Sequence, residues 1–292
     1  MRSATVWISA ARPKTLWASI APVMMGTAMA QRAGSLDWPS ALCALASALF
    51  IQIGTNYCND VADFLKGADT ESRRGPTRAT VSGLVTPRQM IAATAIAFVL
   101  SAVFAAYLIW RAGWPLAVVG VLSIASGILY TAGPKPLAYV GLGDVFTLIF
   151  FGPVAVAGSY YVQTLEWSWT PVVAGLAPGL LSMAILTVNN LRDIETDARA
   201  GKRTLAVRFG AGFAKWEYTL CIVGAAVVPL VLVAYMGAPP NATAATVIVF
   251  AAIPAIRTVW GESNAALLNH VLAYTALLML AFAMLFSIGW NL

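Results

Sequence analysis

Apolar segments recur along almost the whole chain, and short polar segments separate them. Each is roughly long enough, at about 20 residues, to cross a hydrocarbon core as a helix. No ten-residue run alternates apolar and polar positions as a membrane β-strand does. The pattern therefore predicts an all-α integral membrane protein with nine transmembrane helices. We place them at residues 15–31, 39–58, 89–110, 114–132, 143–164, 169–191, 213–236, 242–260 and 264–290.

The composition agrees with a membrane protein. Hydrophobic residues make up 60% of the chain and charged residues 10%, whereas soluble domains carry roughly 25% charged residues. We expect membrane lipid, and no nucleic acid, as a partner. The sequence leaves the oligomeric state open.

The distribution of charge predicts how the helices are oriented. If the N-terminus is cytoplasmic, 16 of the 18 Lys and Arg residues fall on the cytoplasmic side, and Arg32 and Arg111 stand outside. Basic residues in short loops mark that side. Ten of the twelve acids share it, all except Asp37 and Glu166. We therefore expect a multi-pass protein of the cell inner (cytoplasmic) membrane, with its polar chemistry facing the cytoplasm.

We treat residues 1–292 as a single membrane domain with two longer cytoplasmic loops, at about 59–88 and 192–212. The first apolar segment also has features of a secretory signal, because basic residues precede it and small residues end it. Trp17 and Pro22 inside that segment disfavour this interpretation. Whether the first helix is processed stays open.

Acidic and amide residues recur at the cytoplasmic ends of the second and sixth predicted helices. NYCNDVADFLKGAD begins at Asn56, and NNLRDIETDARAGKR begins 133 positions later. Residues three and four apart share one face of a helix, so each motif forms a stripe. The recurrence of the motif 133 positions later predicts two pseudo-repeats of four helices, plus one further helix, around a central cavity. The stripes are Asn56, Asp60 and Asp63, and Asn189, Asp193 and Asp197.

Facing carboxylates repel one another unless a cation lies between them. Oxygen ligands select hard cations, and Mg²⁺ bridges carboxylates to substrate phosphates. We therefore predict Mg²⁺ and a phosphate-bearing substrate, with solvated helix ends as the alternative. Arginine suits phosphate oxygens, although topology and lipid headgroups explain a share of the basic residues. The expected diphosphate-binding residues are Lys66, Arg73, Arg74, Arg78, Arg192, Lys202 and Arg203.

The two stripes, in NDVADFLKGAD and NNLRDIETDARAGKRTLAVRFG, resemble the paired aspartate-rich motifs of the UbiA superfamily of intramembrane prenyltransferases. ARPKTL, GPTRATVSGLV and YTAGPKPLAYVGLGD resemble the branch that prenylates 1,4-dihydroxy-2-naphthoate in menaquinone synthesis. The resemblance runs from Arg12 to about Gly210. It implies nine helices around a central cavity that cytoplasmic loops cap.

The resemblance also implies an activity. It is the Mg²⁺-dependent transfer of a polyprenyl group from polyprenyl diphosphate to an aromatic acceptor, with loss of CO₂. The implied catalytic residues are Asp60, Asp63, Asp193 and Asp197. The implied metal ligands are these carboxylates with Asn56, Asn59, Asn189 and Asn190.

The chain departs from the family's motifs at two places. Gly67 stands where many relatives have a third aspartate, so Asp69, two residues later, is expected to orient a loop or a water. Tyr130 is followed by Lys135 at a spacing one residue longer than in several relatives. Both are expected in the pocket without an assigned role.

Three charged residues have two interpretations each. Arg12 and Lys14, at the start of the first helix, either bind the acceptor's carboxylate or the diphosphate, or anchor the topology. Asp144 either stabilises the start of the fifth helix through its dipole or orients the acceptor.

Two alternative functions remain. The first keeps the superfamily and changes the acceptor to 4-hydroxybenzoate, homogentisate, a porphyrin or a sugar phosphate. The second is a secondary transporter, since repeats also place matched acids in transporters. Transport sites usually lie near the bilayer midplane, whereas these acids end their helices. The exact acceptor and the length of the prenyl chain stay open.

Overall fold

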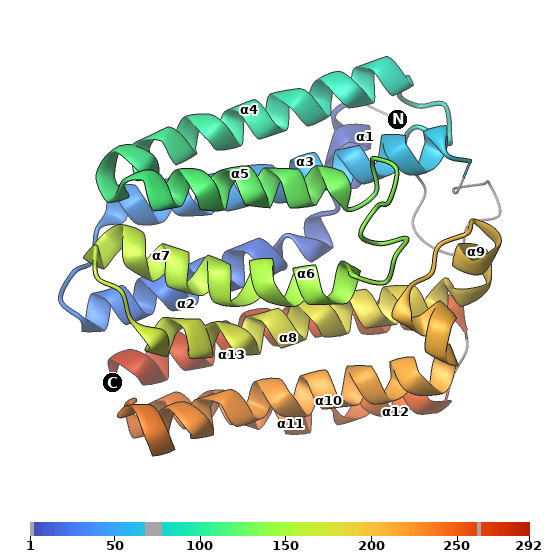
Figure 1. The fold of residues 1–292 in the computed structure, drawn as a ribbon. Coiled ribbons are helices and arrows are strands. Elements are labelled where there is room, and N and C mark those ends of the chain that lie inside the picture. The colour runs from blue at the N-terminus through green and yellow to red at the C-terminus, as the bar shows by residue number, and fades with distance from the viewer. Residues whose placement is uncertain (1–2, 68–77, 262–263) are drawn as a thin grey trace.

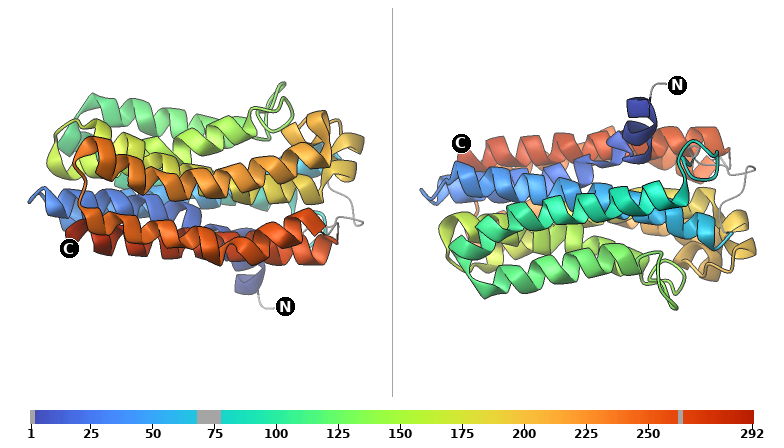
Figure 2. Two further views of the ribbon diagram at one scale, coloured as in Figure 1. Left: turned by 90° about the horizontal axis from the view of Figure 1, so that it is seen from below. Right: turned by 90° about the horizontal axis from the view of Figure 1, so that it is seen from above.

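The computed structural model describes residues 3–67, 78–261 and 264–292, and within these ranges the chain is helical with no strand. The long helices lie side by side in one bundle (Figure 1), and α1 (Ser3–Ala10) projects from its edge (Figure 2). Successive helices run through α2 (Trp17–Arg32), α3 (Trp38–Leu65), α4 (Pro87–Ala112), α5 (Trp114–Leu129), α6 (Gly143–Ile149), η2 (Phe150–Val154), α7 (Ala155–Thr164), α8 (Trp169–Arg192), α9 (Ile194–Arg199), α10 (Leu205–Met236), η3 (Pro240–Val247), α11 (Ile248–Ala251), α12 (Ile253–Gly261) and α13 (Ala265–Asn291).

Seven helical segments of the described chain are long and apolar enough to cross a membrane. Two of the seven are composite, because α6, η2 and α7 form one rod and η3, α11 and α12 form another. The predicted all-α membrane class is confirmed. Since α2 and α5 have 16 residues each, shorter than a typical span of about 20, nine crossings remain a prediction.

A belt of tryptophans marks one end of the bundle. The five indole side chains are between 61% and 79% exposed. They lie where α3, α5 and α8 begin and where α4 ends, and such belts form at membrane–water interfaces. Arg32 and Arg111, the two basic residues predicted to stand apart from the rest, are at this same end. The belt consists of Trp38, Trp110, Trp114, Trp167 and Trp169.

Small residues allow the rod of α6, η2 and α7 to pack closely on α8. A Cβ atom on Gly175 would lie 2.6 Å from the Cα of Pro153, and one on Gly179 would lie 2.4 Å from the carbonyl oxygen of Leu148. Glycines four residues apart on a membrane helix permit such backbone contact. The rod bends at this contact, where Gly152 has non-helical dihedral angles and η2 is a π-helical turn.

The opposite end of the bundle from the tryptophan belt carries both acidic stripes. We call it the site end, and it comprises the last turns of α3 and α8, loop 130–142 and α9. Helix α3 continues to Leu65, seven residues past the predicted end at 58. Its polar last turns stay helical because their side chains find partners in the loops of the site end.

Candidate active site

A cavity of about 370 Å³ lies inside the bundle. Its lining residues on α3 run from Ala44 to Asp63, which is about 28 Å of helix at 1.5 Å per residue. Polar side chains line the site end, and apolar ones such as Leu108, Leu116 and Val162 line the other. The cavity therefore joins a charged region to a long apolar passage.

Both stripes reach this one cavity, although 133 positions separate them in the sequence. Eleven of the residues singled out from the sequence contribute to its wall. They are Arg12, Asn56, Asn59, Asp63, Arg78, Tyr130, Asn189, Asn190, Asp193, Asp197 and Lys202.

Asp63 is the most heavily bonded acid of the first stripe. Its carboxylate is 2% exposed and accepts from Arg78 Nη2 at 3.2 Å, from Lys202 Nζ at 3.2 Å and from the Tyr139 hydroxyl at 3.3 Å. The Lys202 ammonium also lies 3.8 Å from Asp197 and faces the ring of Tyr139. One ammonium group therefore joins carboxylates from the two stripes. Sequence analysis did not single out Tyr139, although it lies in one of the quoted motifs.

The spacing predicted that the second stripe lies on one continuous helix, but in the structure a break interrupts it. Helix α8 ends at Arg192, and Asp193 has φ −103° and ψ 10° before α9 begins. The backbone still bonds across the break, from Asp193 N to Asn189 O at 3.2 Å and from Asp197 N to Asp193 O at 2.8 Å. These four-residue steps keep the three side chains on one side, so all three line the cavity.

Arg192 binds two residues of the second stripe from outside the cavity lining. Its Nε donates to Asp193 Oδ1 at 2.8 Å and its Nη2 to both Asp193 Oδ2 and Asn189 Oδ1, the latter at 2.7 Å. A further bond goes to Asn269 on α13. Arg192 is 3% exposed and does not line the cavity. The structure thus places it behind Asp193, and Asn269 is a contact that local spacing could not reveal.

Asp60, like Arg192, is not part of the cavity lining. It is 2% exposed, does not line the cavity, and accepts backbone N–H bonds from Ala79 and Thr80, both at 3.1 Å. These bonds hold the segment after Arg78 against α3. In this arrangement Asp60 positions Arg78 beside Asp63.

Several other predicted residues lie away from the cavity. Lys66 donates to the carbonyl oxygen of Thr131 at 2.6 Å, and Asp144 is buried with no hydrogen bond to its Oδ1 in the described part of the chain. Exposed positions outside the cavity are those of Lys14, Lys135 and Arg203. Asp69, Arg73 and Arg74 lie outside the described residues.

Amide and hydroxyl groups complete the polar wall. Asn56 Nδ2 donates to the carbonyl of Ala11 at 3.0 Å, and Asn59 Oδ1 accepts from the Thr131 hydroxyl at 2.6 Å. Tyr130 also lines the cavity. Its phenolic hydroxyl is protonated at neutral pH, because the ordinary pKa of a tyrosine is about 10, and it offers a hydrogen-bond donor.

The donor set fits a hard divalent cation. Carboxylate and amide oxygens of both stripes line one region, and Lys202 already places a positive charge between Asp63 and Asp197. No three His, Cys, Asp or Glu side chains converge as a ligand cluster within residues 3–67, 78–261 and 264–292. The carboxylate and amide oxygens that do line this region are ligands of the kind that Mg²⁺ takes, since it is commonly held by one or two carboxylates and completed by substrate phosphates.

Fold and cavity define a class: a helical membrane protein in which paired acidic motifs cap an apolar passage. The model of the UbiA prenyltransferase family matches residues 19–267, and the chain belongs to that family. The 1,4-dihydroxy-2-naphthoate octaprenyltransferase of Mycobacterium tuberculosis is 43% identical over 233 residues, which cover 80% of this chain and 79% of that protein. The Escherichia coli protein of the same name is 39% identical, covering 77% and 75%. The resemblance read from the motifs is confirmed.

Solved structures share the fold. A UbiA homologue from Aeropyrum pernix without ligand superimposes with a TM-score of 0.70 at 18% identity, covering 91% of this chain and 96% of that one. A homologue from Archaeoglobus fulgidus bound to DMAPP and Mg²⁺ gives 0.63 at 16% identity, covering 97% and 99%. At these identities the likeness establishes the architecture of the bundle.

Proposed function

We propose that this protein transfers a polyprenyl group from polyprenyl diphosphate to 1,4-dihydroxy-2-naphthoate, with loss of CO₂, in menaquinone biosynthesis. One observation carries the proposal: a single cavity, lined along about 28 Å of α3, joins the acids and bases of both motifs to an apolar passage. The two relatives named for this reaction, which match over three quarters or more of their length, support the choice of acceptor.

The charged region is the diphosphate site. Arg78 and Lys202 reach the cavity and carry the positive charge that a diphosphate requires. Asp63, Asp193 and Asp197, with asparagine oxygens of the same stripes, are the proposed ligands of Mg²⁺, and Asp60 and Arg192 hold this set in place. Bound Mg²⁺ would neutralise the charge that develops on the departing diphosphate.

The apolar passage holds the prenyl chain. Phe146, Phe150 and Phe151 line it on the rod of α6, η2 and α7, and aromatic faces stabilise nearby positive charge. As the allylic carbon–oxygen bond breaks, the carbon develops cationic character, and a dry wall protects it from water. The electron-rich ring then forms the new carbon–carbon bond. The net reaction exchanges the carboxylate of the ring for the prenyl group and releases CO₂ and diphosphate.

We place the site end at the cytoplasmic face of the inner membrane. The basic loops of the sequence favour this orientation. The water-soluble acceptor and the diphosphate group then reach the acidic stripes from the cytoplasm. A tryptophan belt at the other end is consistent with the second membrane interface.

The test is a product assay on purified protein in detergent. The protein is given Mg²⁺ and octaprenyl diphosphate with 1,4-dihydroxy-2-naphthoate, 4-hydroxybenzoate or homogentisate, and the lipid product is analysed by mass spectrometry. We expect octaprenyl naphthoquinol and its oxidised form. Preferred prenylation of another acceptor would contradict the proposal. No consumption of diphosphate by detergent-solubilised protein would instead favour a transporter, which needs a sealed compartment.

A further inference from the structure

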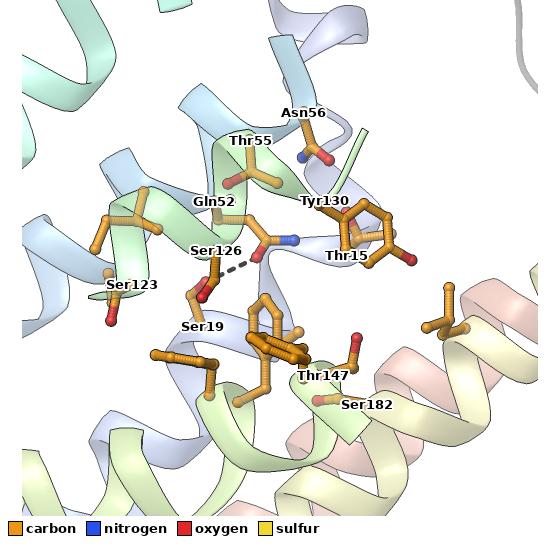
Figure 3. Close-up of a pocket in the computed structure, with 18 of the residues that line it drawn as sticks. Thr15, Ser19, Gln52, Thr55, Asn56, Ser123, Ser126, Tyr130, Thr147 and Ser182 are labelled. Atoms are coloured by element: carbon orange, nitrogen blue, oxygen red, sulfur yellow. Dashed lines mark hydrogen bonds between the residues drawn. The ribbon is translucent and has the colours of Figure 1, made fainter. Parts of the chain in front are cut away.

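A second polar region lies deeper in the cavity than the acids. Hydroxyl groups from α2, α3, α5, α6, α8 and the 3₁₀ turn η1 (Pro13–Thr15) surround one space there, together with a glutamine from α3 (Figure 3). Neither the diphosphate site nor a hydrocarbon chain needs these groups. They are Thr15, Ser19, Gln52, Thr55, Ser123, Ser126, Thr147 and Ser182.

Gln52 is the amide of this region. It precedes Asn56 by four residues, so it lies one turn, about 6 Å, deeper along α3. Ser19 Oγ donates to Gln52 Oε1 at 3.4 Å. The amide nitrogen projects into the space shared with Thr15 and Tyr130 (Figure 3) and donates to no group in the described part of the chain. An oriented donor therefore faces the cavity at the depth where the reacting carbon of the prenyl group would follow the diphosphate.

The chemistry of the two substrates decides which of them uses this donor. The prenyl chain has no hydrogen-bonding atom, and its diphosphate belongs with the charged groups above. The aromatic acceptor carries a carboxylate and two hydroxyls, and a few placed polar groups commonly orient a ligand in an apolar site. Arg12 also lines the cavity and lies nearer to the site end than Thr15 does. Its positive charge could bind the carboxylate of the acceptor.

On the basis of the proposed function, we propose that Gln52 is a specificity-determining residue whose amide donates a hydrogen bond to the acceptor hydroxyl remote from the carboxylate. Ser19 holds the amide oxygen so that the nitrogen faces the ring. The acceptor's carboxylate then lies toward Arg12, and the ring lies flat beneath the diphosphate site. In this way the site selects a dihydroxylated acceptor over one that lacks the remote hydroxyl.

The test compares Gln52→Leu with the wild type and with Thr94→Val. The latter is a matched loss of a polar group on a membrane helix, since within the described residues Thr94 bonds to the carbonyl of Met90 on its own helix. KM is measured for 1,4-dihydroxy-2-naphthoate and for octaprenyl diphosphate. The inhibition constant is measured for 1-hydroxy-2-naphthoate, which lacks the remote hydroxyl. Gln52→Glu, of nearly the same shape, is a second variant.

We expect Gln52→Leu to raise KM for the dihydroxy acceptor by about 10- to 100-fold, the effect of leaving one buried hydroxyl unpaired. KM for the diphosphate and the inhibition constant of the monohydroxy compound should change less than about threefold, because neither ligand uses the lost bond. Thr94→Val should resemble the wild type. Gln52→Glu should lose less affinity for the dihydroxy acceptor than Gln52→Leu, because the hydroxyl can reverse the bond and donate to the carboxylate.

Equal weakening of both naphthoates by Gln52→Leu would overturn the inference, since it would show a general change in the cavity. So would an unchanged KM for the dihydroxy acceptor, or a raised KM for the diphosphate alone. These outcomes differ from failure of the proposed function, in which the wild type itself does not prenylate the dihydroxynaphthoate.

Discussion

Replacing Lys202 with methionine tests how the two stripes share one positive charge. The ammonium lies 3.2 Å from Asp63 and 3.8 Å from Asp197, and the lysine side chain is 13% exposed. Methionine keeps an apolar stem against the Tyr139 ring and removes the charge. A hydrogen bond to a charged group contributes about 1.5–3 kcal/mol, so we expect the free energy of unfolding to fall by about 2 kcal/mol. For a chain of this size, that loss corresponds to about 4–8 °C in Tm.

The assay is thermal unfolding of the purified protein with and without Mg²⁺ and diphosphate. Because the two carboxylates of the variant lack their shared cation, added Mg²⁺ should raise its Tm by several degrees more than it raises that of the wild type. Lys215→Met is the matched control, since Lys215 donates to the carbonyl of Trp260 on the bundle's exterior. The reasoning is refuted if Lys202→Met loses no more stability than the control, or if Mg²⁺ shifts both proteins equally.

Three further predictions address the supports of the site. Arg192→Met should lower kcat by about tenfold or more in the prenyl-transfer assay, because Asp193 loses two charge-assisted bonds; activity within twofold of wild type would contradict its positioning role. Gly179→Ala should reduce the free energy of unfolding by about 1–3 kcal/mol, as its Cβ would lie 2.4 Å from a carbonyl oxygen, whereas Gly212→Ala, with open space around it, should not. Tyr130→Phe should lower kcat/KM by a similar factor at every pH between about 6 and 9, because a phenolic hydroxyl, with an ordinary pKa of about 10, stays a donor throughout this range; a difference that disappears toward pH 9 would refute this.

Hydropathy predicted most helices of the bundle closely. The segments placed at 169–191 and 264–290 are α8 at Trp169–Arg192 and α13 at Ala265–Asn291. Prediction was weaker where polar residues remain helical, as at the end of α3, because hydropathy treats every polar residue as solvent-exposed. The π-helical turn at η2 was not anticipated either, since it depends on contact with glycines of another helix.

The candidate site was predicted in its composition and less well in its arrangement. The offset of 133 residues correctly suggested that two motifs meet, and both line one cavity. Helical spacing could not distinguish Asp63, which faces the cavity, from Asp60, which binds the backbone of a loop that arrives nearly twenty residues later. Gln52 was overlooked within an apolar run, although a glutamine one turn before Asn56 was a usable signal.

The central claim is that the two stripes form one metal and diphosphate site. Its most direct test is the Mg²⁺-dependent turnover of labelled octaprenyl diphosphate by purified Asp63→Asn, Asp197→Asn and the double variant. Groups that act as one unit give non-additive losses. We predict that each single variant loses about 100-fold or more in turnover, and that the double variant loses far less than the product of the two. Near-normal turnover by either single variant, or fully multiplicative losses, would contradict the account.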